Sequence, residues 1–133
     1  MISYPVRANI VQRDMDLIRE ILLQVEANPE TDGRTEFVYQ SPEEMGISGH
    51  SLEEIAYHTN LLIDDRYLKG NPSTGYTMPS IMRLTNSGHD FLDNVRDPGV
   101  WGRVKGRIGG LSHLALPVVA ALAEAEIKKW FCV

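Results

Sequence analysis

The sequence predicts a domain of the α+β class that is mainly helical, and three observations support this prediction. Apolar residues recur at helical spacing in two long segments, 12–27 and 51–65. Two short extended pieces, 67–69 and 80–84, flank a polar loop and are able to pair as a hairpin. The length of 133 residues and the 43% hydrophobic content suit one core and are too small for two comfortable domains.

Three local features help to place the individual elements: acids at a helix start, alternating side chains in a strand, and a proline. Asp14 and Asp16 lie at the expected start of the first helix, where the positive end of the helix dipole favours carboxylates. Phe37 and Tyr39 fall on one face of a strand-like run. Pro117 must lie near the start of the last helix or kink its first turns, because proline lacks the N–H that a helix interior needs. In chain order we expect a helix at 12–27, a loop at 28–34, a strand at 35–40, at most one helical turn in 41–51, a helix at 51–65, the hairpin of 67–69 with 80–84, a helix from 86, a weak helix in 100–110 and a helix at 112–131.

Cap residues define the starts of two of these helices. Ser51 can cap helix 51–65, and Glu54, three residues later, completes a capping box. Thr85 can cap the next helix, and Gly88 leaves no side chain where that helix must pass close to a neighbouring element. The apolar face of helix 51–65 consists of Leu52, Ile55, Ala56, Thr59, Leu62 and Ile63.

The order of the elements predicts a more specific architecture. A serine-capped amphipathic helix, a polar hairpin and then "LT-x-x-G" opening another helix form the arrangement of a winged helix-turn-helix. We therefore predict a winged helix-turn-helix-like domain with an extra C-terminal helix. The expected divisions are an N-terminal extension at 1–11, the winged-helix-like domain at 12–110, and a C-terminal apolar helix at 111–133 for packing or dimerisation.

Three stretches carry a resemblance to a known family: "QRDMDLIREILLQVE", "IAYHTNLLIDDRYLKG" and "RLTNSGHDFLDNVRDPGVWGRVK". In this order and spacing they resemble the signatures of a family of small bacterial and prophage proteins, domain of unknown function 2513. The resemblance covers roughly Gln12 to Ile108 and extends loosely into the final helix. It implies a winged-helix-like plan and provides no activity or catalytic residue to transfer. Relatives tend to read "AGLI" where this chain has "DRYL", Asp65 to Leu68.

Charge argues against insertion of helix 51–65 into the DNA major groove. The net charge of −5, from 18 acidic and 13 basic residues, gives no overall attraction to nucleic acid. Groove-binding helices depend on Lys and Arg contacts to phosphate, whereas the outer face of this helix carries four carboxylates and neither of those residues. Basic residues cluster later in the chain, with Lys128 and Lys129 as additions, and the candidates for DNA contact are Arg96, Arg103, Lys105 and Arg107.

The outer face of helix 51–65 also suggests protein binding. Tyr57 and Leu61 are four residues apart, and we expect both to be exposed among acids that include Glu54 and Asp64. An apolar pair ringed by charge is typical of a docking site. The alternative is that segment 35–40 or the final helix covers the pair.

The final helix predicts a homodimer. It is apolar nearly all round, so it must be buried on more than one side. The rest of the domain can cover one side and a second subunit the other, and C-terminal helices often form the dimer in this fold class. The candidate dimer contacts are Leu114, Val118 and Leu122.

Patterns of catalysis and metal binding are absent from the sequence. The four histidines form no His-x-x-x-His or His-Glu-x-x-His spacing, and neither a Gly-x-Ser-x-Gly elbow nor a lysine-bearing phosphate loop occurs. His58 borders the apolar face and is expected to be a hydrogen-bonded boundary residue, and the single cysteine, Cys132, excludes an internal disulfide. We therefore expect no catalytic residue, no cofactor and no metal site.

Two functions remain open for a protein of this kind. The N-terminus lacks a signal-peptide pattern and the longest apolar run falls short of the ~20 residues of a membrane span, so we expect a cytoplasmic protein with no membrane contact. A DNA-associated transcriptional regulator of a bacterium or prophage ranks marginally first. The alternative is a protein-interaction module on a winged-helix scaffold that does not insert its acidic helix into DNA.

Overall fold

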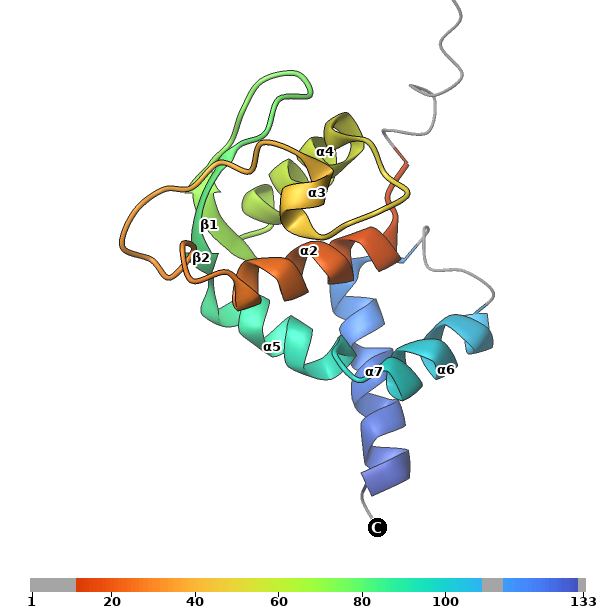
Figure 1. Ribbon diagram of the computed structural model, residues 1–133. Coiled ribbons are helices and arrows are strands. Elements are labelled where there is room, and N and C mark those ends of the chain that lie inside the picture. The colour runs from red at the N-terminus through yellow and green to blue at the C-terminus, as the bar shows by residue number, and fades with distance from the viewer. Residues whose placement is uncertain (1–11, 109–113, 132–133) are drawn as a thin grey trace, which may run out of the picture.

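The computed structural model describes residues 12–108 and 114–131, where the chain forms six helices and a two-stranded antiparallel sheet (Figure 1). The predicted α+β class with mainly helical content is confirmed. The expected N-terminal extension and the expected start of the last helix at residue 112 lie outside the described residues. With the labels of Figure 1, the elements are α2 (Met15–Ala27), α3 (Pro42–Met45), α4 (Leu52–Asp64), β1 (Leu68–Asn71), β2 (Ser80–Leu84), α5 (Asn86–Val95), α6 (Pro98–Ile108) and α7 (Leu116–Phe131).

Helix α2 lies at the centre of the fold and packs against α4, α5 and β2 (Figure 1). Asp14 is its N-cap and accepts a hydrogen bond from the backbone N–H of Leu17 at 3.2 Å. Because three elements surround the helix, its apolar stripe is wide and nearly continuous. The buried residues of α2 are Met15, Leu17, Ile18, Ile21, Leu22 and Val25.

Helix α4 begins and ends at local signals in its sequence. Ser51 accepts a hydrogen bond from the backbone N–H of Glu54 at 3.1 Å, which is one half of the predicted capping box. The Glu54 carboxylate lies instead against His50, with Oε1 and Nδ1 2.9 Å apart. The helix ends in a Schellman motif, in which Arg66 adopts the left-handed backbone conformation with a φ of 63°.

Strands β1 and β2 form the predicted hairpin, and residues 72–79 form its loop, called the wing loop below. The predicted strand at 35–40 is wrong except at Phe37, which forms a single bridge to Ile81. The ladder stops there because the next pairing position toward the wing loop is Pro79, which has no N–H to donate.

Helices α5 and α6 are separate, and each has its own cap. Thr85 caps α5 as predicted, accepting from the N–H of Gly88 at 2.9 Å. Gly88 confirms the predicted close approach, because a Cβ there would lie 2.1 Å from the carbonyl oxygen of Tyr67. Arg19 of α2 donates to two carbonyls at the C-terminal end of α5, both at 2.6 Å. Asp97 then caps α6 by accepting from two backbone N–H groups, at 2.8 and 3.0 Å.

Helix α7 packs against α5 and α6, and its C-terminal end extends past the other helices at the bottom of Figure 1. Pro117 lies in its first turn, as predicted. One side of the helix is buried by the chain itself, whereas Val118 on another side is 46% exposed. Within the described ranges, none of the helices has the length and apolar character needed to cross a membrane. The buried residues of α7 are Leu116, Val119, Ala123 and Glu126.

Candidate functional site

The wing loop partly covers the outer face of α4. Tyr57 and Leu61 are half-buried, rather than exposed as predicted. The ring centroid of Tyr76, in the wing loop, lies 6.5 Å from that of Tyr57. Asn60 holds the loop on the helix, because it donates to the Ser73 hydroxyl and accepts from the Ser73 N–H, each at 3.0 Å. The segment that covers Tyr57 is therefore the wing loop, which neither predicted alternative considered.

Acidic residues border this covered centre, and α4 contains no Lys or Arg. Glu54, predicted to belong to the acidic ring, is half-buried against His50 at the start of the helix. Asp64 is exposed, as are two further acids. The feature named the α4–wing surface consists of Tyr57, Leu61 and Tyr76 at its centre and Glu53, Asp64 and Asp65 at its rim.

The four basic residues predicted to contact DNA all have partners within the protein. Each of the four has a partner on another helix, and spacing along the sequence could not reveal these partners. Hydrogen bonds from Arg96 hold the pKa of the Glu26 carboxyl below its ordinary value, and the same pair raises the pKa of Arg96. Phosphate would therefore compete with the acids that already neutralise Arg96, Lys105 and Arg107. The pairs are Arg96 with Glu26 at 2.8 Å and with Asp93 at 2.7 Å, Arg103 over the Trp130 ring with its Cζ 3.6 Å from the centroid, Lys105 with Asp16 at 2.8 Å, and Arg107 with Glu126.

A second group of cations lies at the base of the wing. Lys69 of β1 and Arg83 of β2 are directly opposite each other and are both exposed. Like charges in such a pair destabilise a hairpin. Arg66, which is exposed and has a left-handed backbone conformation, lies two positions before the start of β1. No ion pair joins these three cations to an acid among the residues that the structure describes. The predicted hairpin could have revealed this cross-strand pair if its register had been derived.

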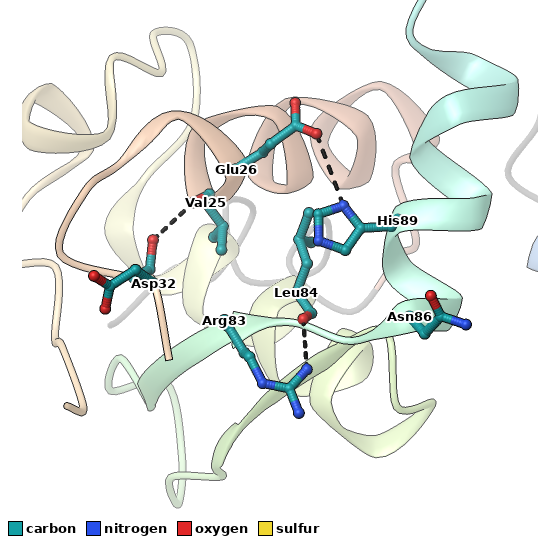
Figure 2. A pocket seen from close by; sticks show the side chains of 8 residues that line it. Val25, Glu26, Asp32, Arg83, Leu84, Asn86 and His89 are labelled. Carbon is teal, nitrogen blue, oxygen red and sulfur yellow. Dashed lines mark hydrogen bonds and ion pairs between the residues drawn. The ribbon is translucent and has the colours of Figure 1, made fainter. Parts of the chain in front are cut away.

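An open hollow of about 390 Å³ lies between α2, β2 and α5 (Figure 2). Figure 2 shows that Glu26 and His89 point toward each other across it, 3.9 Å apart, whereas the Arg83 guanidinium turns back to its neighbouring carbonyl at 2.9 Å. Asp32 is paired with Arg34 at 2.7 Å. The charged groups of the hollow are thus largely paired with one another or with neighbours.

The N-terminal ends of α2 and α4 meet at a cluster of two histidines and two carboxylates. His58 is fully buried, accepts at Nε2 from the backbone N–H of Asp14, and contacts the Glu54 carbonyl through Nδ1, each at 2.8 Å. Burial lowers the pKa of His58, and both ring nitrogens are used by the neutral form. Asp14, His50 and Glu54 bring one potential metal-ligand atom each within 4.8 Å of one another. The prediction of His58 as a hydrogen-bonded residue is confirmed, although it is buried rather than at a boundary.

The predicted dimer contacts differ in exposure. Leu114 and Leu122 are half-buried and pack against the core, whereas Val118 is exposed on the outer side of α7. No second chain is part of the structure, so these positions remain predictions.

Comparison with known proteins supports the resemblance found in the sequence. Residues 12–110 match the model of a family described as "Hypothetical protein (DUF2513)". The chain is also 30% identical over 122 residues to an uncharacterized protein of Haemophilus influenzae strain Rd, a match that covers 90% of this chain and 98% of that protein. None of the solved structures matches the chain at a significant level.

Proposed function

Since this chain belongs to the DUF2513 family, whose description names no activity, we propose its function from its surface: a non-enzymatic module that binds a protein partner through the α4–wing surface. A bacterial setting is supported by the Haemophilus influenzae relative. The order of helix, bridging segment, short helix, helix and hairpin supports a winged-helix-like plan, in which α4 takes the place of the DNA-reading helix.

The wing loop on α4 is the observation that carries this proposal. A recognition helix enters the major groove only if its outer face is free, and here Ser73 is hydrogen-bonded to Asn60 on that face. The aromatic contact between Tyr76 and Tyr57 adds a second tie. The same loop completes a half-buried aromatic and aliphatic centre, which is the usual middle of a protein-docking site.

Charge selects the chemistry of the partner. Asp64 and Asp65, the rim acids at the C-terminal end of α4, are exposed, and α4 itself contains no Lys or Arg. A complementary partner therefore presents Lys or Arg residues around an apolar anchor. We propose a basic segment of another protein as the occupant.

A peptide library displayed on phage and selected against the full chain tests this proposal. We expect selected peptides to carry Lys or Arg beside an apolar residue. The double variant Asp64→Lys and Asp65→Lys should weaken their binding at least about tenfold, measured by fluorescence anisotropy. It should fold normally, because cations at a helix C-terminus are favoured by the dipole.

The matched control makes the same change of net charge elsewhere, with Asp90→Lys on α5 and Glu124→Lys on α7, both at exposed positions. If the selected peptides lose affinity equally in both double variants, or if neither double variant weakens them, the α4–wing surface is not the docking site.

DNA contact remains a second candidate, favoured by the cross-strand pair of Lys69 and Arg83 at the base of the wing. Phosphate between two like charges would relieve their repulsion and would not require α4 to enter a groove. We would measure binding of labelled random-sequence duplex at low and moderate salt. A wing contact predicts retention that falls steeply with salt and is lost when both residues are changed to Glu, whereas contact through α6 predicts the same loss for Arg103→Glu with Lys105→Glu.

We also propose that the outer side of α7 pairs two copies of the chain. The support is apolar surface at Val118 and neighbouring alanines, which are exposed among the residues that the structure describes. Light scattering should give a dimer mass for the native chain and a monomer mass for Val118→Asp. A monomer mass for the native chain would contradict the proposed dimer.

A further inference from the structure

We infer that Asp14, His50 and Glu54 form a binding site for one divalent transition-metal ion, such as Zn²⁺. The three side chains come from two places in the chain, the N-cap of α2 and the start of α4, and their potential ligand atoms all lie within 4.8 Å of one another. All three residues are half-buried, which leaves room for water to complete the coordination. This inference does not depend on the proposed function.

The donor set selects the class of metal. One imidazole nitrogen with two carboxylate oxygens suits Zn²⁺ and its first-row neighbours, whereas Mg²⁺ and Ca²⁺ prefer oxygen donors alone. Ligand atoms around zinc lie roughly 3–3.5 Å apart, given metal–ligand distances of about 2 Å. Side-chain rotations that move the ligand atoms by about an ångström would therefore bring the three atoms to zinc-binding distance, without a change in the backbone.

The surroundings hold these ligands in place. The buried ring of His58 is hydrogen-bonded to the backbone of both Asp14 and Glu54, so it fixes the start of α2 beside the first turn of α4. Asp14 uses Oδ1 to cap α2 through the Leu17 N–H, and His50 Nδ1 is 2.9 Å from Glu54 Oε1. Supporting contacts of this kind orient the ligands of known metal sites.

Electrostatics favours a cation between these groups. Two carboxylates drawn together by folding repel each other, and the positive ends of two helices offset this only in part. No Lys or Arg forms an ion pair with Asp14 or Glu54 among the residues described. A divalent ion would offset both charges and join the starts of α2 and α4.

Zinc titration of the untagged full chain by calorimetry tests the inference. A Cys132→Ser background removes the one thiol of the sequence as a competing ligand. We expect one Zn²⁺ per chain and a rise in Tm on binding, because the ion binds the folded state. Asp14→Asn, His50→Gln and Glu54→Gln should each weaken zinc binding at least about tenfold, since even loss of a supporting contact has that effect at known sites.

The variants are chosen so that they fold without the metal. Asn caps helices as well as Asp does, and the two glutamines retain the size and hydrogen-bonding capacity of the originals. His89→Gln, a change of an exposed histidine on α5, should bind zinc as the parent does. Absence of zinc binding by the parent, or equal affinity in all three site variants, would overturn the inference and leave Asp14 and Glu54 as helix-terminal acids only.

Discussion

Gly88 fixes the distance between α5 and the segment that leads into β1. A Cβ at this position would lie 2.1 Å from the carbonyl oxygen of Tyr67. That carbonyl cannot move freely, because it accepts the N–H of Thr85 at 3.1 Å. We predict that Gly88→Ala lowers the free energy of unfolding by ~1–3 kcal/mol, the usual cost of overpacking. Urea denaturation of the variant and the parent measures this change in the free energy of unfolding.

Gly102 on α6 provides the matched control for this prediction. Nothing lies within 4 Å of a Cβ built there, and the residue is exposed in a helix. Gly102→Ala should therefore raise stability by ~0.5–1 kcal/mol through helix propensity. Equal effects of the two substitutions would contradict the assignment of Gly88 to a close contact.

Arg66 occupies the left-handed position at the end of α4, with a φ of 63°. The residue in this left-handed position after a helix is most often glycine. We predict that Arg66→Gly stabilises the protein by ~0.5–1 kcal/mol, whereas Arg66→Ala, which removes the same charge and keeps the strain, does not. Thermal unfolding of the two variants decides between strain and charge.

His58 predicts a pH dependence of stability. Burial lowers its pKa in the folded protein, while nearby Asp14 and Glu54 oppose the shift and His50 adds to it. In the unfolded chain the pKa is ordinary, about 6.5, so the unfolded state takes up the proton first. The free energy of unfolding should therefore fall as the pH drops below about 6.5 toward the lower folded pKa. Urea denaturation across this range, with a chelator present, measures the slope.

Two histidine variants assign that slope. His58→Gln should be less stable at neutral pH, because buried hydrogen bonds are lost, and should show a flatter dependence on pH. His89→Gln changes an exposed histidine and should keep the parent's slope, apart from its contact with Glu26 at 3.9 Å. An unchanged slope in His58→Gln would refute the assignment.

At the scale of elements, the Asn60 side chain forms hydrogen bonds between α4 and the wing loop, beside the aromatic contact of Tyr57 with Tyr76. Asn60 exchanges two hydrogen bonds with Ser73, both at 3.0 Å. We predict that Asn60→Ala costs ~1–2 kcal/mol and raises hydrogen exchange across residues 72–79. Thr77→Val is the control, because the Thr77 hydroxyl bonds within the loop, to the Thr74 carbonyl. Unchanged exchange in Asn60→Ala would mean that the aromatic contact alone holds the loop.

The elements that could be predicted from sequence are those with local causes. Ser51 and Thr85 mark helix starts because their hydroxyls bond N–H groups three residues ahead. The prediction of a strand at 35–40 was wrong because pairing beyond Phe37 is limited by a distant residue, Pro79, and not by the composition of the segment itself. The end of α5 likewise depends on Arg19, which is more than seventy residues away in the chain.

At the scale of the whole molecule, the candidate sites were harder to predict for the same reason. The spacing of Arg103, Lys105 and Arg107 suggests a free basic stripe, but spacing along one helix carries no information about the helices that face it. Lys105 meets Asp16 of α2, and Arg107 meets Glu126 of α7. The histidine–carboxylate cluster was missed because Asp14 lies 36 positions before His50, so the spacing of four between His50 and Glu54 gives no sign of the third side chain.

These pairings give Arg103 and Arg107 of α6 a structural role, which is to attach α7. Arg103 stacks on Trp130, and Arg107 pairs with Glu126, whose side chain is only 3% exposed. We predict that Arg107→Met costs ~1–3 kcal/mol, because it leaves a buried carboxylate without its partner. Glu126→Leu in the same chain should recover most of that loss, since an apolar pair of similar size needs no counter-charge.

Urea denaturation of the two single variants and the double variant gives the coupling between these positions. If the only role of Arg107 were to bind a ligand, Arg107→Met would leave the free energy of unfolding unchanged. The double-mutant cycle with Glu126→Leu would then show no coupling. Coupling of the expected sign would mean that any nucleic acid bound through α6 must compete with the contact that holds α7 in place. DNA affinity and folding stability would then change in opposite directions on Glu126→Leu alone, because that change frees the Arg107 guanidinium while it removes the contact between the helices.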